Sequence, residues 1–303
     1  MFNLWPNYLR KYFQDRDALI CCLTVGTLAR SYARLGRGIL GAFFPDKCLV
    51  CGVYIRQTLD APPDFDDVKI FFNTSLARLV CPKCLEKGFT PIHPPFCISC
   101  GKSFTTSDCE NHLCSDCILA AEKGRPTVGR VRAFGCHELL LRDLVHQFKY
   151  GKKICLARPL GRLMFHTFME HFSSPSPPPL DIIIPVPLHT RRLRQRGFNQ
   201  AYLLVRDFPG MWSAAIGRSP GWSISNTILL RSKNTPSQTG FDRKDRLKNL
   251  RDAFTVKGSE KIKGKRILLI DDVYTTGATS GEAASTLLNA GALSVDLLVL
   301  VRA

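Results

Sequence analysis

One stretch near the carboxyl terminus constrains the fold more than any other part of this 303-residue chain. After Arg266, residues 267–270 are Ile-Leu-Leu-Ile, an apolar run typical of a parallel strand buried on both faces. The run ends in two adjacent acids, Asp271 and Asp272, then comes a loop rich in threonine, and residues 280–289 have the pattern of a helix. In an α/β fold this order places the acids and the loop at the carboxyl edge of a sheet, where ligands bind.

The loop after the acids has the features of a phosphate-binding turn. It consists of Thr275, Thr276, Gly277, Ala278 and Thr279. Backbone N–H groups of such a turn converge on an anion, and glycine permits close approach or a positive φ. The two acids suit the adjacent hydroxyls of a ribose, so we expect a ribose-phosphate site. The alternative is an ordinary strand–turn–helix with two surface acids, but adjacent acids at the end of a buried strand serve no packing purpose.

This segment resembles the phosphoribosyl-pyrophosphate (PRPP) signature of type I phosphoribosyltransferases. The match has no gap. It lacks the Gly-Lys-Ser/Thr ending of nucleoside triphosphate loops and the G-x-G-x-x-G spacing of dinucleotide folds. The resemblance implies that Asp271 and Asp272 hold the ribose hydroxyls as the catalytic pair, and that residues 275–279 bind the 5′-phosphate.

The pattern from residue 128 onward predicts an α/β domain with a mostly parallel sheet flanked by helices. Helical patterns cover 139–148, 156–172 and 199–208, and apolar strands are predicted at 181–186, 227–230, 266–270 and 295–301. Before this domain, composition shifts to cysteine, proline and glycine. We therefore expect a basic extension at 1–44, a Cys-rich module at 45–124 and a phosphoribosyltransferase-like domain at 125–303. The extension is either a loose segment or a misplaced start, or a basic amphipathic helix that touches membrane or nucleic acid.

Four pairs of cysteines, each separated by two residues, predict a metal-binding module. The pairs are Cys48 and Cys51, Cys81 and Cys84, Cys97 and Cys100, and Cys114 and Cys117. They supply ligands for two closed Cys₄ zinc sites, which are structural because no coordination position is open. Sequential pairing is one arrangement and interleaved pairing another, with Cys109 or His112 as substitute ligands.

A second set of residues predicts contacts with phosphate groups. Four arginines follow the strand at 181–186: Arg191, Arg192, Arg194 and Arg196. In the phosphoribosyltransferase fold the loop at this place binds pyrophosphate, and the alternative is a solvated basic turn. Lys149 directly follows the helix predicted at 139–148, and it either reaches pyrophosphate or stabilises the helix dipole.

The run Arg-Gly-Phe-Asn-Gln-Ala at 196–201 is similar to the signature of the ComF family of competence-related proteins. This resemblance covers residues 45–303. It implies an amino-terminal zinc module, a role in the uptake of transforming DNA, and a basic lid that closes over PRPP. The lid residues are Arg231, Lys233, Gln238, Arg243 and Arg246. A disordered insertion is the alternative for this segment.

The formal net charge of +17 favours polyanionic partners such as phosphates and nucleic acid. We expect PRPP with Mg²⁺ as ligand, and single-stranded DNA and competence proteins as partners. Phosphoribosyl transfer to an unidentified acceptor, PRPP sensing without chemistry, and non-enzymatic single-strand binding remain open. The cysteine count and the lack of a signal-peptide pattern favour a reducing, cytoplasmic location, and we expect no integral membrane span.

Overall fold

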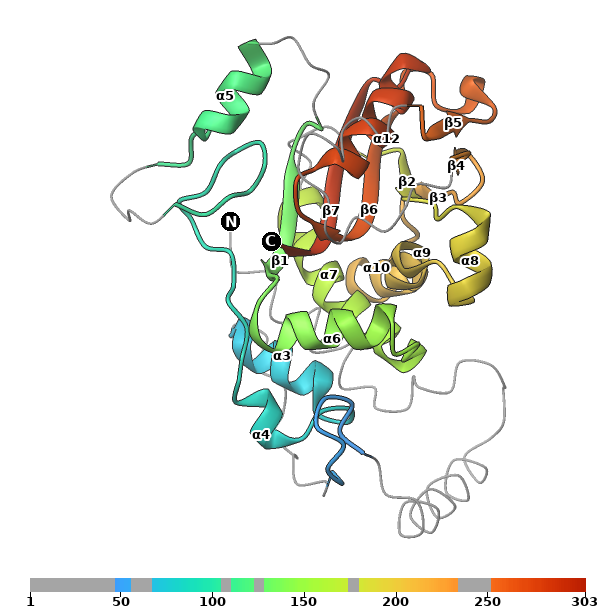
Figure 1. Ribbon diagram of the computed structural model, residues 1–303. Coiled ribbons are helices and arrows are strands. Elements are labelled where there is room, and N and C mark those ends of the chain that lie inside the picture. Colours follow the sequence, from blue (N-terminus) through green and yellow to red (C-terminus); the bar gives the residue numbers. More distant parts are fainter. Residues whose placement is uncertain (1–46, 56–66, 105–109, 123–127, 174–179, 234–251) are drawn as a thin grey trace. The chain divides into compact units, whose positions relative to one another are not determined.

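The computed structural model describes residues 47–55, 67–104, 110–122, 128–173, 180–233 and 252–303 (Figure 1). The helices are α3 (Val68–Leu76), α4 (Pro82–Leu85), α5 (Ser115–Glu122), α6 (Leu139–Lys149), α7 (Ala157–Phe172), α8 (Thr190–Arg196), α9 (Gln200–Val205), α10 (Phe208–Ile216) and α12 (Ala278–Asn289). The strands are β1 (Val131–Cys136), β2 (Ile182–Pro185), β3 (Ser223–Ile224), β4 (Leu229–Arg231), β5 (Phe254–Val256), β6 (Arg266–Tyr274) and β7 (Ser294–Arg302).

These elements belong to two units. One contains Met1–Gly88 and Gly210–Ser219, and the other contains Phe89–Pro209 and Pro220–Ala303. The first Cys₄ group lies in the first unit, whereas the second Cys₄ group lies in the same unit as the sheet. The domain boundaries predicted near 44 and 124 adjoin residues outside the described part of the chain, so that division stays a prediction.

A parallel sheet with the order β1-β7-β6-β2-β3 organises the second unit. The long strands β6 and β7 pair from Arg266 with Ser294 to Tyr274 with Arg302. Because all neighbours run in the same direction, the carboxyl ends of β1, β2, β6 and β7 lie at one edge. Strands β6 and β7 end at this carboxyl edge. Asp271 and Asp272 lie near the end of β6, and Arg302 is the last residue of β7.

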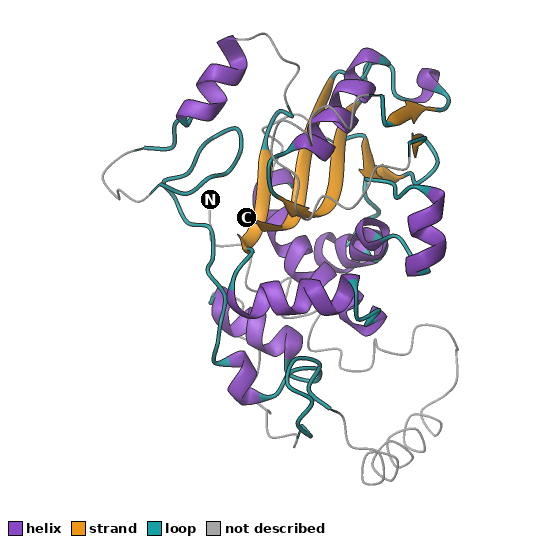
Figure 2. Cartoon of the chain, in the orientation of Figure 1, coloured by secondary structure: helices purple, strands orange, loops and turns teal. Residues whose placement is uncertain are grey.

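Helices cover both faces of the sheet, as Figure 2 shows. On one face α12 packs against β6 and β7, with Ala283, Ala284 and Leu287 in a core that includes Ile267 and Leu297. On the other face α7 contacts β1 and β7, and α9 contacts β2 and β6. Both faces of β6 are therefore buried along its apolar part, as the uninterrupted run Ile-Leu-Leu-Ile predicts.

The predicted fold class is confirmed: the second unit is an α/β structure with a parallel sheet between helices. The helices predicted at 139–148 and 156–172 correspond to α6 and α7, and the strands predicted at 181–186 and 295–301 correspond to β2 and β7. Within the described residues, no helix combines the length and the apolar character needed to cross a bilayer.

Three local details differ from the sequence prediction. Strand β6 continues through Asp271 and Asp272 to Tyr274 instead of ending before the acids, because it pairs with β7 along its whole length. The arginine-rich segment after β2 forms the short helix α8 rather than an open loop. The helix predicted at 199–208 is divided, since α9 ends at Val205 and α10 begins at Phe208.

Candidate functional site

The eight paired cysteines form two separate clusters in the order of the sequence. The first cluster contains Cys48, Cys51, Cys81 and Cys84, and the second contains Cys97, Cys100, Cys114 and Cys117. Within each cluster all four sulfur atoms lie within 4.8 Å of one another. The sequential pairing is therefore the one formed. His112 is outside the second cluster and stacks on Phe104, and Cys109 lies outside the described residues.

The backbone around each cluster is shaped for thiolate ligands. Gly52 and Gly101, which follow a cysteine pair directly, have φ values of +76° and +68°, so each supplies a tight turn that favours glycine. Burial opposes ionisation of Cys48, but backbone N–H groups of Cys51 and Cys81 outweigh it and lower the pKa of the Cys48 thiol to about 6.

The second cluster has the same arrangement. Burial raises the pKa of the Cys97 thiol, but hydrogen bonds from backbone N–H groups, mainly those of Cys114 and Cys100, outweigh it and lower this pKa to about 6. Burial raises the pKa of the Cys117 thiol, so the full set of thiolates requires a cation. Four sulfur ligands at this spacing fit one tetrahedral metal ion in each cluster.

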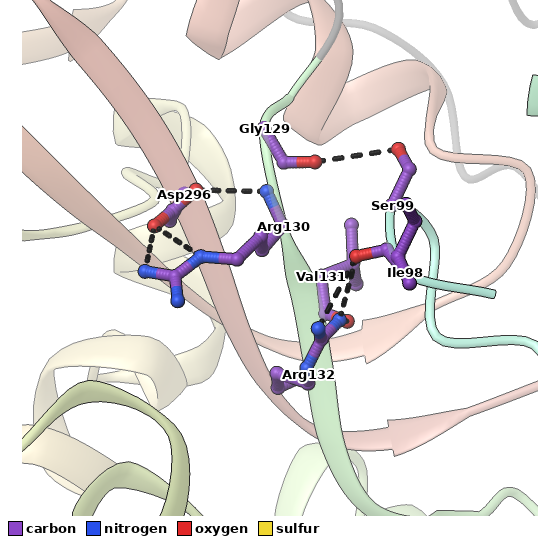
Figure 3. A network of polar contacts seen from close by, with 7 residues as sticks. All are labelled: Ile98, Ser99, Gly129, Arg130, Val131, Arg132 and Asp296. Atoms are coloured by element: carbon purple, nitrogen blue, oxygen red, sulfur yellow. Dashed lines mark hydrogen bonds and ion pairs between the residues drawn. The ribbon is translucent and has the colours of Figure 1, made fainter. Parts of the chain in front are cut away.

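The second Cys₄ group is attached to the edge strand β1 by a network of polar contacts (Figure 3). The backbone N–H of Val131 donates to the Ser99 carbonyl oxygen at 2.7 Å, and the Arg132 guanidinium donates to the Ile98 carbonyl oxygen at 3.2 Å. A Cβ at Gly101 would lie 2.6 Å from the Val131 carbonyl oxygen, so only glycine allows this approach. The group therefore covers a strand edge that would otherwise be open.

The two acids of β6 lie in a different environment at the carboxyl edge. Lys149, the last residue of α6, forms an ion pair with Asp272, with 2.7 Å between Nζ and Oδ1. Asp272 is only 6% exposed, and its neighbour Asp271 is half-buried. Consecutive residues of a strand point to opposite faces, so the two carboxylates are held differently. The backbone N–H of Asp272 donates to Oδ1 of Asp271 at 2.9 Å.

Burial, together with the negative charge of Asp272, raises the pKa of Asp271 to about 7. Lys149 and Arg231 act in the opposite direction. Arg231 ends β4, and burial together with the charge of Arg192 lowers its pKa to about 10, while Asp271 opposes that change. Lys149 of α6 and Arg231 of β4 therefore act on Asp271, and Arg192 of α8 acts on Arg231.

Helix α8 divides the four predicted arginines into two pairs. Arg192 and Arg196 are partly buried and repel each other electrostatically, as residues four apart on one helix face do. The Arg196 guanidinium also lies 5.4 Å from the centroid of the Tyr150 ring. Arg191 and Arg194 are exposed. The structure therefore brings Arg192, but not all four arginines, within electrostatic range of Arg231, which itself acts on Asp271.

The loop at 275–279 begins α12 directly beyond the acids. Gly277 is the N-cap of α12 and has a φ of +72°. A Cβ at this position would lie 2.6 Å from the hydroxyl oxygen of Tyr274, so the turn requires glycine for two reasons. The first N–H groups of a helix have no partner within the helix, and they attract anions. The helix begins two residues earlier than the sequence predicted, at Ala278.

Part of the predicted lid falls outside the described residues, namely Gln238, Arg243 and Arg246. Lys233 lies 3.6 Å from the Asp252 carboxylate, in a mostly exposed ion pair. Sequence reasoning did not identify the partner of Lys149, nor the contact between Arg302 and Tyr274. The signals for Lys149 were its place at the end of a helix and the run Phe-Lys-Tyr-Gly at 148–151, which resembles a feature of the same family, and neither indicates a carboxylate as its partner.

The fold and the site define an α/β protein with two Cys₄ groups suited to metal ions and, at the carboxyl edge of its sheet, a group of charged side chains and a glycine turn at the start of α12. The chain matches no protein-family model. It is 30% identical to Competence protein F of Haemophilus influenzae over 210 residues, which are 69% of this chain and 85% of that protein. It is 35% identical to DNA utilization protein YhgH of Salmonella typhi over 159 residues, 52% of this chain and 66% of the relative.

A third relative, Competence protein ComFC of Streptococcus pneumoniae, is 28% identical over 257 residues, which are 84% of this chain and 100% of that protein. These similarities show that the chain belongs to the ComF family, as the sequence resemblance predicted. The similarity to relatives named for competence and for DNA utilization is the functional information that these comparisons carry.

Proposed function

We propose that the carboxyl edge of the sheet binds PRPP or a related ribose phosphate together with Mg²⁺. The observation that carries the proposal is the joining of two acids, a glycine turn at a helix N-terminus and convergent cations in one place. Asp271, the more exposed acid, meets a ribose hydroxyl first. Asp272 becomes available when Lys149 exchanges it for a ligand oxygen, and the 275–279 loop holds the 5′-phosphate.

Transfer of the phosphoribosyl group is the chemistry that this arrangement favours. The reaction separates a diphosphate from C1′ through a transition state with positive charge on the sugar. Lys149, Arg192 and Arg231 stabilise the negative charge of the departing diphosphate, and the loop holds the sugar still. Magnesium, when bound, neutralises diphosphate oxygens and is held mainly by the ligand and water. Two structural zinc ions in the Cys₄ groups complete the proposal.

The test is the melting temperature of the full chain with Mg²⁺ and PRPP, ribose 5-phosphate or pyrophosphate. We expect PRPP to raise the melting temperature most, because it occupies the ribose, phosphate and cation subsites together. The double variant Asp271→Asn with Asp272→Asn should lose that increase. Asp181→Asn is the matched control, because Asp181 precedes β2 at the opposite edge, where it accepts from Lys265 and Arg266.

An equal response of wild type and the double variant would show that the acids hold no ribose. If Asp181→Asn also loses the increase in melting temperature, the loss in the double variant reflects general destabilisation and not a missing ribose contact. Release of pyrophosphate in the presence of candidate nitrogenous acceptors then separates a transferase from a PRPP sensor.

A specific surface favours single-stranded nucleic acid as a second ligand. Residues 150–155 are all exposed, and this segment contains Tyr150, Lys152, Lys153 and Ile154. Arg196 connects it to α8, whose Arg191 and Arg194 are also exposed. Neither segment contains an acid. Basic side chains that surround an exposed aromatic ring fit the phosphates and bases of a single strand.

This second proposal agrees with relatives named for DNA utilization. We expect the affinity for a single-stranded oligonucleotide to fall steeply with salt, because several phosphates are contacted. The double variant Lys152→Ala with Lys153→Ala should reduce both the affinity and the salt slope. Lys257→Ala with Lys261→Ala, in the segment that follows β5, should change neither. A flat salt response in wild type would contradict the proposal.

A further inference from the structure

Arg302, at the end of β7, contacts both the second Cys₄ group and the residue that precedes the 275–279 loop. Its Nε donates to the Cys100 carbonyl oxygen at 3.1 Å, and its Nη2 lies 3.6 Å from the Cys100 sulfur. The same guanidinium lies over the ring of Tyr274, with its central carbon 5.7 Å from the ring centroid. Tyr274 and Arg302 are also paired residues of β6 and β7, so the contact is built on the sheet backbone.

The Tyr274 ring in turn supports the glycine turn. Its hydroxyl oxygen would lie 2.6 Å from a Cβ at Gly277 and two of its ring carbons 3.0 Å from it, so the ring packs closely beside this glycine. The carbonyl oxygen of Tyr274 accepts from the backbone N–H of Ala303 at 2.8 Å. The position of Gly277, and with it the first turn of α12, therefore depends on where this ring lies.

We propose that Arg302 is a positioning residue that couples the second Cys₄ group to the 275–279 loop. A thiolate bound to a metal ion keeps negative charge and accepts a charge-assisted hydrogen bond, so Cys100 holds the guanidinium. The guanidinium holds the Tyr274 ring through a cation–π contact, and the ring holds Gly277. The inference rests on the proposed function in one respect, namely that the loop binds a phosphate group.

The coupling makes the metal ion of this group a determinant of anion binding at the loop. Removal of the metal takes away the negative charge that attracts Arg302 at the Cys100 sulfur, so only the Cys100 carbonyl oxygen still holds the guanidinium and the Tyr274 ring is less firmly fixed. Binding energies between linked sites are reciprocal, so an anion at the loop slows loss of the metal from this group. The first Cys₄ group has no part in this proposal, since the contacts of Arg302 involve Cys100.

The first experiment measures hydrogen exchange of the loop peptide in the full chain, with metal bound and after removal by a chelator. We expect metal removal to accelerate exchange at 275–279 in wild type. In Arg302→Met, exchange should already be fast with metal bound and should change little on its removal. Arg302→Lys keeps the cation and one hydrogen bond, and it should restore part of the protection.

The matched control is Arg132→Met. Arg132 also connects the sheet to the Cys module, through the Ile98 carbonyl oxygen, but its guanidinium lies over Phe96 rather than Tyr274. This variant should release the metal faster without changing loop exchange in the metal-bound state. Tyr274→Leu, which removes the ring and leaves the bond to Cys100, should loosen the loop without faster metal loss.

The second experiment measures PRPP affinity in the presence of Mg²⁺. We expect Arg302→Met to weaken binding by about three- to tenfold, the usual size of a cation–π or coupling effect, and Arg132→Met to leave it unchanged. Loop exchange that does not respond to metal in wild type, or that responds equally in Arg302→Met, would overturn the coupling. If wild type binds no PRPP, the proposed function fails while the exchange experiment still decides whether Arg302 couples the two places.

Discussion

The Cys₄ groups and the carboxyl-edge site are assembled from residues at very different separations in the sequence. Each Cys₄ group joins two nearby pairs, Cys48 to Cys84 in one case and Cys97 to Cys117 in the other. The edge site joins Lys149 of α6 to Asp272 of β6 and brings in Arg192 and Arg231 from two further elements. Local spacing therefore predicts the ligand pairs of the first kind of site, though not which pairs share an ion, whereas the second kind exists only in the complete sheet.

The two regions also differ in how their charges are balanced. Buried thiolates need a metal ion, because burial works against their ionisation. The acids of the edge site already have cations beside them, so this site can remain folded without a ligand and exchange an internal partner for one. Metal removal therefore leaves buried thiols without their counter-charge, whereas a ligand at the edge site replaces an ion pair that already exists.

The largest expected effect comes from removing one ligand of each Cys₄ group. Cys97→Ser and Cys48→Ser should each lose about one metal ion per chain, because three thiolates hold zinc much more weakly than four. Cys97→Ser should also destabilise the sheet unit by several kcal/mol, since its group covers the edge of β1. Metal analysis and thermal unfolding measure both quantities. Cys155→Ser, at an exposed cysteine outside the groups, is the control and should change neither.

The next largest effect concerns the ion pair at the edge site. Lys149→Met leaves the buried carboxylate of Asp272 without its cation, and we expect a loss of about 3 kcal/mol in the free energy of unfolding. Asp272→Asn in the same chain should recover most of that loss, because the uncompensated charge is then gone. A double-mutant cycle in denaturant measures the coupling. Additive effects of the two substitutions would show that the pair contributes nothing.

The raised pKa of Asp271 predicts a dependence of stability on pH. The folded state holds this proton up to about pH 7, whereas an unfolded chain loses it near the ordinary value of 3.8. Between these values the folded state binds more protons, so the stabilising contribution is present at low pH and is lost as pH rises through 7. Asp271→Asn should therefore be more stable than wild type by about 4 kcal/mol at pH 8, the free-energy equivalent of about three pKa units, and equal to it near pH 3.

Urea unfolding at a series of pH values checks this prediction, and Asp181→Asn serves as the comparison. The pKa of Asp181 is lowered, with the N–H of Arg266 and the Lys265 ammonium overcoming the effect of burial, so its contribution has the opposite sign. A constant difference between Asp271→Asn and wild type at all pH values would contradict the buried, proton-binding carboxyl.

The smallest expected effect separates the arginines of α8. Arg192→Met should weaken PRPP binding by about tenfold, because this guanidinium acts on Arg231 beside the acids. Arg191→Met, at an exposed neighbour on the same helix, should change the affinity by less than about twofold. Calorimetric titration of both variants distinguishes a placed cation from general charge. Equal losses in the two variants would favour the solvated basic turn.

The sequence predicted the parts of the fold that depend on burial. The run at 267–270 has no polar interruption, and it forms the central strand with helices on both faces. The spacing of Leu140, Leu144 and Phe148 predicts α6, and these residues are buried. Helix α8 was missed because it has no apolar periodicity; its N-cap His189 accepts from the backbone N–H of Arg191. Strands β3 and β5 are too short to produce a pattern.

The candidate site was predictable only as far as its members are adjacent in the chain. The acids and the loop follow one another, so their association is certain from the order of residues. The pairing of Lys149 with Asp272 and the contact of Arg302 with Cys100 depend on the register of strands, which the sequence does not reveal. The assignment of ribose and phosphate to these residues stays a prediction.

The most direct measurement is a calorimetric titration of PRPP and Mg²⁺ into the full chain and into Asp271→Asn with Asp272→Asn. The account predicts one binding event per chain in wild type, and loss of at least about tenfold in affinity in the double variant. No heat of binding in wild type, or the same affinity in both proteins, would contradict the claim that this carboxylate pair holds a phosphorylated ribose.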